Sequence, residues 1–570
     1  MSVKQIKDPV YGYIKIDSEL SKNVLDTCTF QRLRNIRQTS YSAFYPAATH
    51  NRFVHSLGVY HLGTIAIEAL IKSIRDAKLL ESAEVGVIET VFKYACLLHD
   101  VGHAPFSHTT EHLYPSNIGS KLYTLLEGKY LGDTENAFET GISEAAPHEI
   151  MSAYIALIKF SEYFDNKFKA SGRIEAALAK ALFVRCITGY SFNDTMSSAQ
   201  DNNKMLFQIF NSVIELLHSD SINVDSLDYL IRDAQTIGFQ NVAIDYRRLL
   251  DGVCIVNDDG KYALGFNKSS VSVIQSYFTA HDNEKRWLQN NAVPIYEGFI
   301  LLRSIQLVHE SFKVTAGSDE KNVFNADSLL EEGVTIGYNP EGPIPVSLQI
   351  PISLLADEDV LFLMKLYSKY NKNSVIAEFF SRDRRRKPLW KNEAEYREFF
   401  HDVWKKMDRF CTILQNTHRT ITFSESDCAK QADEFFTVNS DCKKIIEKQY
   451  QDKSSPDKPT TSKVLKFIKE LESIAQRCNV GFDFVIVKSK LFKSKYESDY
   501  VSNIRICFPK ENELCSVKLL NDVCPPPICQ SESGSGKDMY YIYYRPGESD
   551  FSHKTKLSIV SQLHEYIRNL

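Results

Sequence analysis

The chain contains 570 residues, of which 43% are hydrophobic and 24% are charged. This length and composition predict a globular protein of two to four domains, and they exclude fibrous and largely disordered chains. The 67 lysine and arginine residues against 72 aspartate and glutamate residues give a formal net charge of −5. This balance excludes a protein that coats nucleic acid through its overall charge, so an anionic ligand must be met by a local basic site.

Targeting signals and cysteine spacing point to one compartment. We find no uninterrupted apolar run close to the about 20 residues of a membrane span, and the N-terminal sequence MSVKQIKDPVYGYIKID lacks the apolar segment of a signal peptide. The 12 cysteines are scattered and form no Cys-x-x-Cys pair. This spacing favours reduced thiols over a disulfide framework. We therefore expect a cytoplasmic protein without a membrane-bound part.

Hydrophobic periodicity predicts that residues from about 20 to 420 are mostly helical. The predicted helices cover 52–75, 86–98, 148–170, 173–188, 203–218, 225–235, 294–314, 358–380 and 391–415. Short apolar runs flank the turn sequence Asn257-Asp258-Asp259-Gly260, which predicts a pair of strands at 253–265.

The character of the sequence changes after about residue 430. The polar, proline-containing segment 451–463 predicts an exposed loop, and the Gly/Ser-rich segment 531–537 predicts a turn. Predicted strands cover 482–487, 503–508, 515–520 and 539–544, and a helix is expected at 554–570. The sequence thus predicts a mainly α protein, with a helical body at 1–430 and a smaller C-terminal α+β lobe at 431–570.

The strongest chemical motif is the segment Leu97-Leu98-His99-Asp100-Val101-Gly102-His103. An adjacent His-Asp pair at a helix end can present an imidazole nitrogen and a carboxylate oxygen to one point, and glycine then allows a sharp turn. Such pairs also occur by chance on protein surfaces. The apolar residues before this pair favour its emergence from a core, with His55 and Asp225 as further candidate ligands.

The segment around Asp225 predicts an amphipathic helix. Its polar positions 225, 228, 229, 232 and 233 recur at three- and four-residue spacing, and apolar residues occupy the other face. A solvated surface helix would show the same pattern, so this segment alone does not establish a site.

The order of these residues, a histidine, a His-Asp pair and a distant aspartate, resembles the HD superfamily of metal-dependent phosphohydrolases. The flanking segments are similar to those of deoxynucleoside triphosphate triphosphohydrolases, which include bacterial dGTPases and vertebrate enzymes that carry a sterile alpha motif. The similarity is dense over 5–240 and fainter to about 395. It lies in Asp8–Gly12, Phe30–Gln38, Pro46–Gly58, His99–His108, His148–Glu149 and Val224–Asp233.

The resemblance implies a helical HD core at about 45–240 and hydrolysis of a dNTP to deoxynucleoside and triphosphate. It implies a divalent metal ion, Mn²⁺, Fe²⁺, Mg²⁺ or Zn²⁺, between which the ligand types do not choose. The implied metal ligands are His55, His99, Asp100 and Asp225. The implied catalytic residues are His108, which acts at the α-phosphate, Glu111, which orients it, and His103. The implied substrate-binding residues are Gln38, Arg52, His103, His108, His148, Tyr229 and Asp233.

The sequence departs from the family pattern in three places, one of which is Thr39, where a leucine often stands. Ser226 stands where the family has a phosphate-binding lysine. The family helix that stacks on the nucleobase has no clear counterpart, and the neighbourhood of Arg286, Trp287 and Tyr296 is our candidate for it. The preferred nucleobase therefore stays open.

Regulation is also implied by the resemblance. Lys4, Asp26, Gln31 and Arg34 match positions that bind an activating nucleotide between subunits in some relatives, so we consider a nucleotide-regulated homo-oligomer, a tetramer or hexamer. The alternative is that Asp26 ends a helix and Arg34 makes a surface ion pair. The basic residues Arg382 and Arg384–Lys387 suit a phosphate or single-stranded nucleic acid, but a solvated helix end has the same composition.

Two further functions stay open at this point. One is a different HD phosphohydrolase that acts on a phosphodiester or a signalling nucleotide. The other is a regulatory protein that binds a nucleotide or nucleic acid at an inactive site. The complete set of four expected ligands and the additional histidines favour an enzyme. Bacterial relatives can deplete dNTPs as a defence against phage, and we consider the same role here.

Overall fold

The computed structural model describes residues 3–39, 44–132, 134–193, 201–239, 243–316, 319–324, 329, 332–338, 350–372, 374–383, 385–407, 409, 411–412, 435–451, 458–489, 501–508, 516–524, 539–547 and 553–570. The chain forms two compact units, neither of which is continuous in sequence. Unit 1 comprises Met1–Glu284, Val308–Leu363 and Lys493–Gln530, and unit 2 comprises Lys285–Leu307, Met364–Phe492 and Ser531–Leu570.

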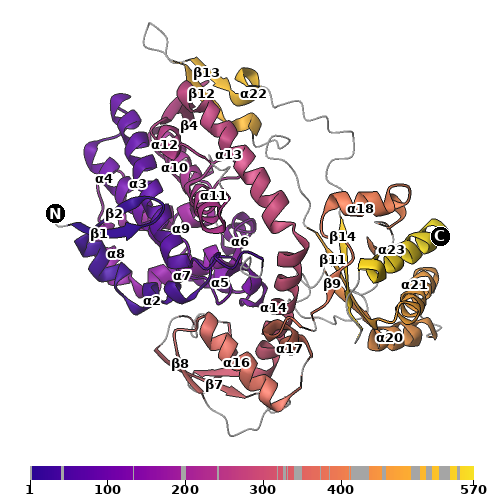
Figure 1. Cartoon of the computed structure of the whole chain (residues 1–570). Coiled ribbons are helices and arrows are strands. Elements are labelled where there is room, and N and C mark those ends of the chain that lie inside the picture. The colour runs from indigo at the N-terminus through magenta and orange to yellow at the C-terminus, as the bar shows by residue number, and fades with distance from the viewer. Residues whose placement is uncertain are drawn as a thin grey trace. The chain divides into compact units, whose positions relative to one another are not determined.

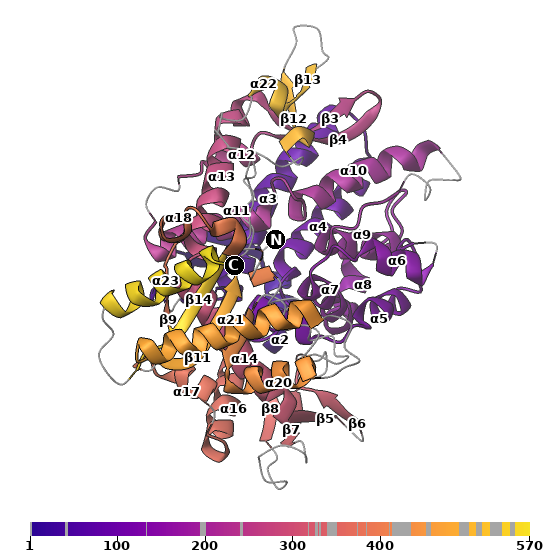
Figure 2. The same ribbon diagram turned by 90° about the vertical axis from the view of Figure 1, so that its right-hand side faces the viewer.

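Unit 1 is mainly helical and is built around the long helix α3 (Arg52–Asp76), which packs against α4 (Ser82–Leu98) and α11 (Val224–Ile237) (Figure 1, Figure 2). By length and composition α3 could cross a membrane, but 67% of its most apolar window is buried inside the protein. This burial is typical of a core helix. The other helices of unit 1 are α1 (Ser18–Leu20), α2 (Cys28–Gln31), α5 (Ile118–Leu125), α6 (Glu135–Gly141), α7 (Pro147–Lys159), α8 (Ser161–Lys167), α9 (Ala176–Thr188), α10 (Asp201–Leu217), α12 (Tyr246–Leu250), α13 (Val271–Asn283) and α22 (Leu520–Val523).

Three small sheets complete unit 1. The antiparallel hairpin of β1 (Val3–Asp8) and β2 (Gly12–Asp17) begins the chain. A second sheet has the order β13-β12-β4-β3, in which β12 (Arg505–Phe508) runs parallel to β4 (Lys261–Asn267), so distant parts of the chain pair within it (Figure 1). The remaining strands of the second and third sheets are β3 (Val253–Asp258), β13 (Ser516–Leu519), β5 (Phe312–Ala316), β6 (Asp319–Asn322), β7 (Glu332–Tyr338) and β8 (Ile350–Ser353).

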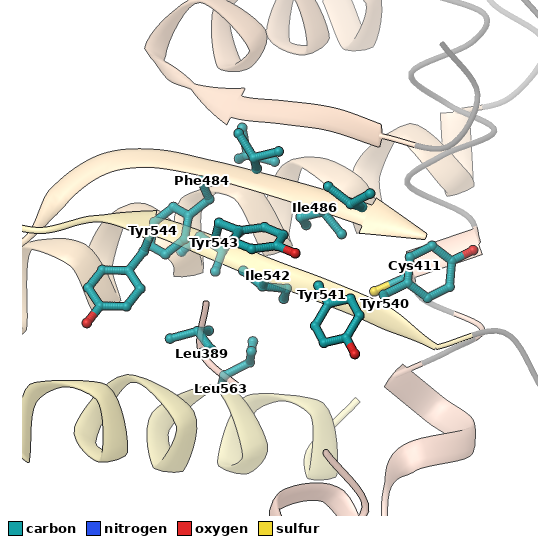
Figure 3. Packing of buried hydrophobic residues seen from close by; sticks show 14 of the residues in the cluster. Leu389, Cys411, Phe484, Ile486, Tyr540, Tyr541, Ile542, Tyr543, Tyr544 and Leu563 are labelled. Carbon is teal, nitrogen blue, oxygen red and sulfur yellow. The ribbon is translucent and has the colours of Figure 1, made fainter. Parts of the chain in front are cut away.

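Unit 2 is an α+β unit around a sheet of order β10-β11-β14-β9. Five consecutive residues of β14, Tyr540–Tyr544, are buried, so both faces of this strand are covered. Figure 3 shows their side chains packed with those of β11 and with Leu389 and Leu563. The elements of unit 2 are β9 (Lys387–Pro388), β10 (Phe435–Asn439), β11 (Gly481–Lys488), β14 (Tyr540–Arg545), α17 (Ser374–Phe380), α18 (Glu393–Phe400), α20 (Ser440–Gln451), α21 (Lys458–Arg477) and α23 (His553–Arg568). Helices α14 (Ala292–Ser311) and α16 (Asp357–Tyr370) run across the unit boundaries.

The mainly α fold class with a smaller α+β part is confirmed, and several element predictions are corrected. The segment 148–170 is two helices, α7 and α8, rather than one. Helix 294–314 ends at Ser311 and is followed by strands, because the apolar pattern continues from α14 into β5. The predicted loop 451–463 includes the start of α21 at Lys458. The predicted turn 531–537 lies outside the described residues.

Candidate metal centre and active site

Two capped helix starts carry two of the expected metal ligands. Asn51 accepts a hydrogen bond from a first-turn backbone amide of α3, and His55 follows in that turn. Asn223 caps α11 in the same way and is followed by Asp225. Asparagine is a favoured cap because its side chain satisfies an amide that has no partner within the helix. The caps therefore fix where α3 and α11 begin, and with this the positions of His55 and Asp225 near the helix starts.

The other two expected ligands lie at the end of α4. His99 is the C-terminal cap of α4, and Asp100 follows it. The chain then turns at Gly102, where a Cβ atom would lie 2.3 Å from the backbone nitrogen of Ser152 in α7. Because glycine alone lacks a Cβ atom, it permits this close approach. The His-Asp pair is thereby held against α7.

These four side chains meet at one point. Asp225 Oδ1 lies 2.9 Å from His55 Nε2 and 3.6 Å from His99 Nε2, and the two Nε2 atoms are 3.4 Å apart. Asp100 lies 3.6 Å from His55 Nε2 through Oδ2 and 3.5 Å from His99 Nε2 through Oδ1. The side chain of Asp225 is 37% exposed, whereas the other three are buried. Two imidazoles and two carboxylates converging in this way fit a divalent metal ion.

The charges of this group favour ionised carboxylates. Burial opposes the ionisation of Asp225, but hydrogen bonds with His55 and His99 hold its pKa well below the ordinary value. Burial also opposes ionisation of Asp100, and the nearby charges of Arg52 and His99 lower its pKa well below the ordinary value. Burial alone would lower the pKa of His55, yet its hydrogen bonds to carboxylates raise it to about 10. Ionised carboxylates are the form that binds metal.

A second group of side chains adjoins the first. His108 Nδ1 and His148 Nδ1 lie 2.6 Å and 2.8 Å from Glu111 Oε1, and the ring of His103 stacks on that of His148 with centroids 3.9 Å apart. Asp100 Oδ1 lies 3.2 Å from His103 Nε2, which joins this group to the metal ligands. The side chain of His108 is 65% exposed, so it is the member that faces solvent.

Electrostatics separates the roles of these histidines. Burial and the charge of Arg52 hold the pKa of His103 well below its usual range, so His103 is neutral. Burial acts in the same direction on His148, but Glu111 outweighs it and raises the pKa of His148 to about 9. Burial opposes ionisation of Glu111, and His108 and His148 nevertheless lower its pKa well below the usual range. Glu111 is therefore a carboxylate that can hold a proton on Nδ1 of either neighbour.

Arg52 connects the two groups. Its guanidinium donates to Asp100 Oδ2 at 2.8 Å and to Ser107 Oγ at 2.9 Å, and its Nη2 lies 3.2 Å from His108 Nε2. Arg52 is buried, so this geometry is fixed by its partners. The structure thus brings the side chains of all the expected metal ligands and expected catalytic residues together with Arg52.

The remaining expected substrate residues are Gln38, in the segment before α3, and Tyr229 and Asp233 on α11. Gln38 is buried, and its Oε1 has no hydrogen-bond partner among the described residues. Asp233 lies 2.7 Å from His50 Nε2, and the backbone of Gln38 donates to His50 O. Tyr229 is half-buried on α11, and burial, with Tyr277 and Asp225, raises its pKa well above the usual value. Because no described residue bonds its Oε1 atom, Gln38 can accept a hydrogen bond from a ligand hydroxyl.

The family departures have structural counterparts. Ser226 Oγ lies 2.5 Å from Tyr277 OH and also bonds Asn223, so this position contributes no positive charge. Tyr296 is buried in unit 2, where its ring stacks on Tyr543 and its hydroxyl donates to Glu378. Tyr296 itself is thus occupied by contacts within unit 2, and the counterpart of the base-stacking helix stays open. The side chain of Trp287 lies outside the described residues.

The four residues of the expected regulatory site form two neighbouring pairs on unit 1. Lys4 Nζ lies 2.7 Å from Asp26, and both side chains are nearly half exposed. Arg34 Nε donates to Gln31 at 2.6 Å, and its guanidinium covers the ring of Phe53 at 3.6 Å. The hydrogen bond from Lys4 lowers the pKa of Asp26, although burial opposes this. The charges of Lys4 and Arg34 lower the same pKa further. The residues expected to form this site are thus near one another.

The basic run is less available than its sequence suggests. Arg385 pairs with Glu297, and the buried Arg386 pairs with Glu378 and Asp483. Arg384 lies outside the described residues. Two arginines of the basic run, Arg385 and Arg386, thus form ion pairs within unit 2. Binding of single-stranded nucleic acid by this run stays a prediction.

Comparison with known proteins agrees with this geometry. The chain is 29% identical over 262 residues to deoxynucleoside triphosphate triphosphohydrolase SAMHD1 of Homo sapiens, covering 45% of this chain and 37% of that protein. It is 24% identical over 352 residues to HD domain-containing protein L394 of Acanthamoeba polyphaga mimivirus, covering 60% and 66%. The chain is thus similar to HD-domain proteins over about half of its length.

Similarity extends to proteins without an assigned function and has clear bounds. Protein MG461 of Mycoplasma genitalium is 27% identical over 274 residues, which is 48% of this chain and 52% of that protein. The chain spans about half or less of the length of most of these curated proteins. No protein-family model matches the chain.

The sequence does not indicate a role for several residues that the structure places around the site. His50, Ser107 and Arg32 received no role, although Ser107 contacts Arg52 and Arg32 donates to His103 O at 2.6 Å. Asp228 and Arg232 were placed on the polar face of the 225–235 helix without a partner. Their burial is the missing signal, because a polar face that is buried must satisfy its charges internally.

Proposed function

We propose that the protein is a metal-dependent dNTP triphosphohydrolase that converts a dNTP and water to deoxynucleoside and triphosphate. The observation that carries the proposal is that two groups of mostly buried side chains adjoin through Asp100. One group has the donors of a divalent metal site, and the other has histidines bonded to a carboxylate. A site that combines metal ligands with proton carriers and an arginine suits hydrolysis of a phosphate ester.

The chain's own residues have distinct tasks in this proposal. His55, His99, Asp100 and Asp225 would hold the divalent ion, which when bound supplies positive charge to a phosphate oxygen and activates water. Glu111 accepts from His108 Nδ1, so it orients the exposed imidazole toward the α-phosphate.

Two residues would position the substrate beside these groups. Arg52 lies within reach of His108 and would contribute donors to phosphate oxygens. Gln38 would bond the sugar 3′-hydroxyl through its unpartnered Oε1. A closely lined sugar edge would exclude a ribonucleotide, because a 2′-hydroxyl would need space and a partner.

The proposal is tested by incubating the purified protein with each dNTP, each NTP, a cyclic dinucleotide and a phosphodiester in Mn²⁺ or Mg²⁺. Chromatography of the products should show deoxynucleoside and triphosphate from one or more dNTPs, and little product from NTPs. Turnover of the phosphodiester or the cyclic dinucleotide with no dNTP turnover would favour a different HD phosphohydrolase. Binding without turnover would favour a regulatory protein.

Regulation by a second nucleotide in a homo-oligomer is a further part of the proposal. It is supported by the exposed cluster of Lys4, Asp26, Gln31 and Arg34, which combines an acidic group with basic groups outside the metal centre. We further propose a cytoplasmic location, at which hydrolysis would deplete the dNTP pool. Depletion of this pool is also the way in which such an enzyme would act in defence against phage.

A further inference from the structure

The ring of His55 is bonded on both sides. Its Nε2 faces the other metal ligands, whereas its Nδ1 lies 2.8 Å from Asp228 Oδ2. Both side chains are fully buried, so no water competes for the contact. Because an ionised carboxylate only accepts hydrogen bonds, Asp228 holds a proton on Nδ1, so Nε2 is the nitrogen that would bind a metal ion.

Asp228 is itself fixed by an arginine and a second carboxylate. Arg232, one turn along α11, donates to both oxygens of Asp228 at 2.9 Å and 3.0 Å. Its remaining Nη1 donates to Asp8 Oδ2 at 3.0 Å. Asp8 Oδ1 accepts from the backbone amides of Val10 and Tyr11, in the turn between β1 and β2. The buried chain of contacts thus runs from the metal ligand to the N-terminal hairpin.

The backbone of α3 makes room for this chain at Gly58. A Cβ atom at Gly58 would lie 1.8 Å from Asp228 Oδ1 and 2.5 Å from Arg232 Nη2. Gly58 lies in the interior of a helix, where glycine is less favourable than alanine. Its position opposite the Asp228–Arg232 pair supplies a structural reason for a residue that helix propensity disfavours.

We propose that Asp228, Arg232 and Asp8 are positioning residues that fix the orientation and tautomer of His55, and that Gly58 is required for their approach. The inference rests on the metal centre of the proposed function. Outer partners of metal-bound histidines commonly support affinity, and their loss lowers it by about 10–100-fold. The same side chains could instead serve only the stability of the fold, so the test must separate metal affinity from stability.

The test is a Mn²⁺ titration of the full chain, in which electron paramagnetic resonance measures the free ion. Asp228→Ala should weaken Mn²⁺ binding by about 10–100-fold, and Gly58→Ala should weaken it in the same direction. Arg232→Lys should weaken it less than Arg232→Ala, because lysine keeps the charge but not the paired donors. The absorption spectrum of bound Co²⁺ should also change in Asp228→Asn, which reports an altered ligand environment directly.

The matched control is Glu84→Gln. Glu84 is a buried carboxylate paired with Arg173, and it lies fifteen residues before His99 on the same helix, about 22 Å away. This variant should lose stability and keep wild-type Mn²⁺ affinity. If Asp228→Asn and Gly58→Ala are folded and bind Mn²⁺ as the wild type does, the inference is overturned and the metal centre stands. If the wild type binds neither Mn²⁺ nor Co²⁺, the proposed metal centre fails, and this inference fails with it.

Discussion

Asp100 belongs to both groups of the candidate site. Its Oδ2 contacts Arg52 and faces His55, while its Oδ1 faces His99 and His103. One carboxylate thus links the expected metal ligands to the neighbouring group of histidines. Because it is buried, its charge acts on neighbours with little screening by solvent.

Removal of one metal ligand should abolish binding of the ion without unfolding the chain. We expect His99→Ala to lose bound metal and to lower turnover by on the order of 10²–10³-fold or more. The helical body is held by apolar burial around α3 and α4, so its far-ultraviolet circular dichroism should persist. Metal analysis of the purified variant checks this. A variant that retained both the ion and full activity would remove His99 from the ligand set.

A pH-dependent contribution to stability is expected from Glu84. The hydrogen bond from Arg173 outweighs burial and lowers the pKa of Glu84 to about 2, from 4.5 for the unfolded group. A lowered carboxyl pKa stabilises the fold above the unfolded pKa, and the contribution is lost as the pH falls through the folded pKa. We expect it to amount to about 2–3 kcal/mol at neutral pH.

Urea unfolding of the wild type and Glu84→Gln measures this contribution. The difference in unfolding free energy should be constant above about pH 5 and should shrink toward pH 3, since the wild type loses the ionised pair there. A difference that did not depend on pH would mean that packing, rather than the charge of Glu84, stabilises this region.

At the residue scale, the sequence could predict candidate metal ligands but not the residues that hydrogen-bond to them. The His99-Asp100 pair is visible because it is adjacent in sequence and follows an apolar run. The partner of His55 Nδ1 is Asp228, 173 residues away, and only the packing of α11 against α3 selects it. Asp225 and Asp228 have the same residue type on the same helix, so sequence alone could not divide their roles.

At the scale of elements, two buried residues hold the loop between Asp100 and Glu111. Arg32 donates to the backbone oxygens of Val101 and His103, and to that of Leu355 just before α16. Asp357, the first residue of α16, accepts from the backbone amides of Phe106 and Arg37 at 2.7 Å and 3.1 Å. The start of α16 is thus tied to the loop that carries His103 and His108, the histidines proposed to be catalytic.

The same loop contains two consecutive residues with positive φ. Phe106 has φ 61° and Ser107 has φ 53°. This conformation is uncommon outside glycine and costs roughly 1–3 kcal/mol at each residue. Surrounding contacts must therefore stabilise the loop, and the bonds to Asp357 are among them.

Removal of the Asp357 carboxylate should loosen this loop while sparing the metal ligands. We expect Asp357→Ala to lower kcat by about 10-fold or more, because a small displacement of His108 from its reacting position is costly. Bound metal should be unchanged. Joint measurement of kcat and metal content checks this, with Glu358→Ala as a control at an exposed position of the same helix. Equal loss of metal and activity in Asp357→Ala would assign Asp357 to general stability instead.

Element prediction succeeded where one periodicity filled a whole segment and failed where it changed. The apolar helices α3 and α4 were found because their core faces are continuous. The strands that follow Ser311 were missed, since Phe312–Ala316 continues the apolar pattern of α14. The hairpin β1–β2 was also missed, because Pro9 and Gly12 shorten each strand to six residues.

At the scale of the whole molecule, each of the two units is built from segments that are far apart in the sequence. Strand β12 from the C-terminal part pairs with β4 in unit 1 and carries β13 on its other edge, while α14 contributes Tyr296 to unit 2. Division of the domains at 1–430 and 431–570 stays a prediction. Composition could indicate that an α+β part follows the helices, but parallel pairing of β12 with β4 depends on contacts between residues 240 positions apart.

The proposed regulation by nucleotide is a prediction about assembly. We expect Asp26→Ala combined with Arg34→Ala to flatten activation by a second nucleotide and to leave bound metal unchanged, because these residues lie outside the ligand set. Ordinary coupling between sites amounts to roughly 1–3 kcal/mol, or about 5–150-fold in affinity.

Sedimentation with and without nucleotides, together with rates on one dNTP while the others are titrated, measures this coupling. The wild type should show cross-activation and association, and the double variant should show neither. Hyperbolic kinetics from an unchanging monomer in the wild type would contradict the regulatory part of the account and leave the catalytic part intact.

The most direct test of the central claim is the bond that the protein breaks. The purified wild type, supplied with Mn²⁺ and a turned-over dNTP in ¹⁸O-labelled water, should release deoxynucleoside and intact triphosphate. The label should appear in triphosphate, because water attacks the α-phosphorus atom in the proposed reaction. Stepwise release of phosphate or pyrophosphate, or label in the deoxynucleoside, would contradict the account.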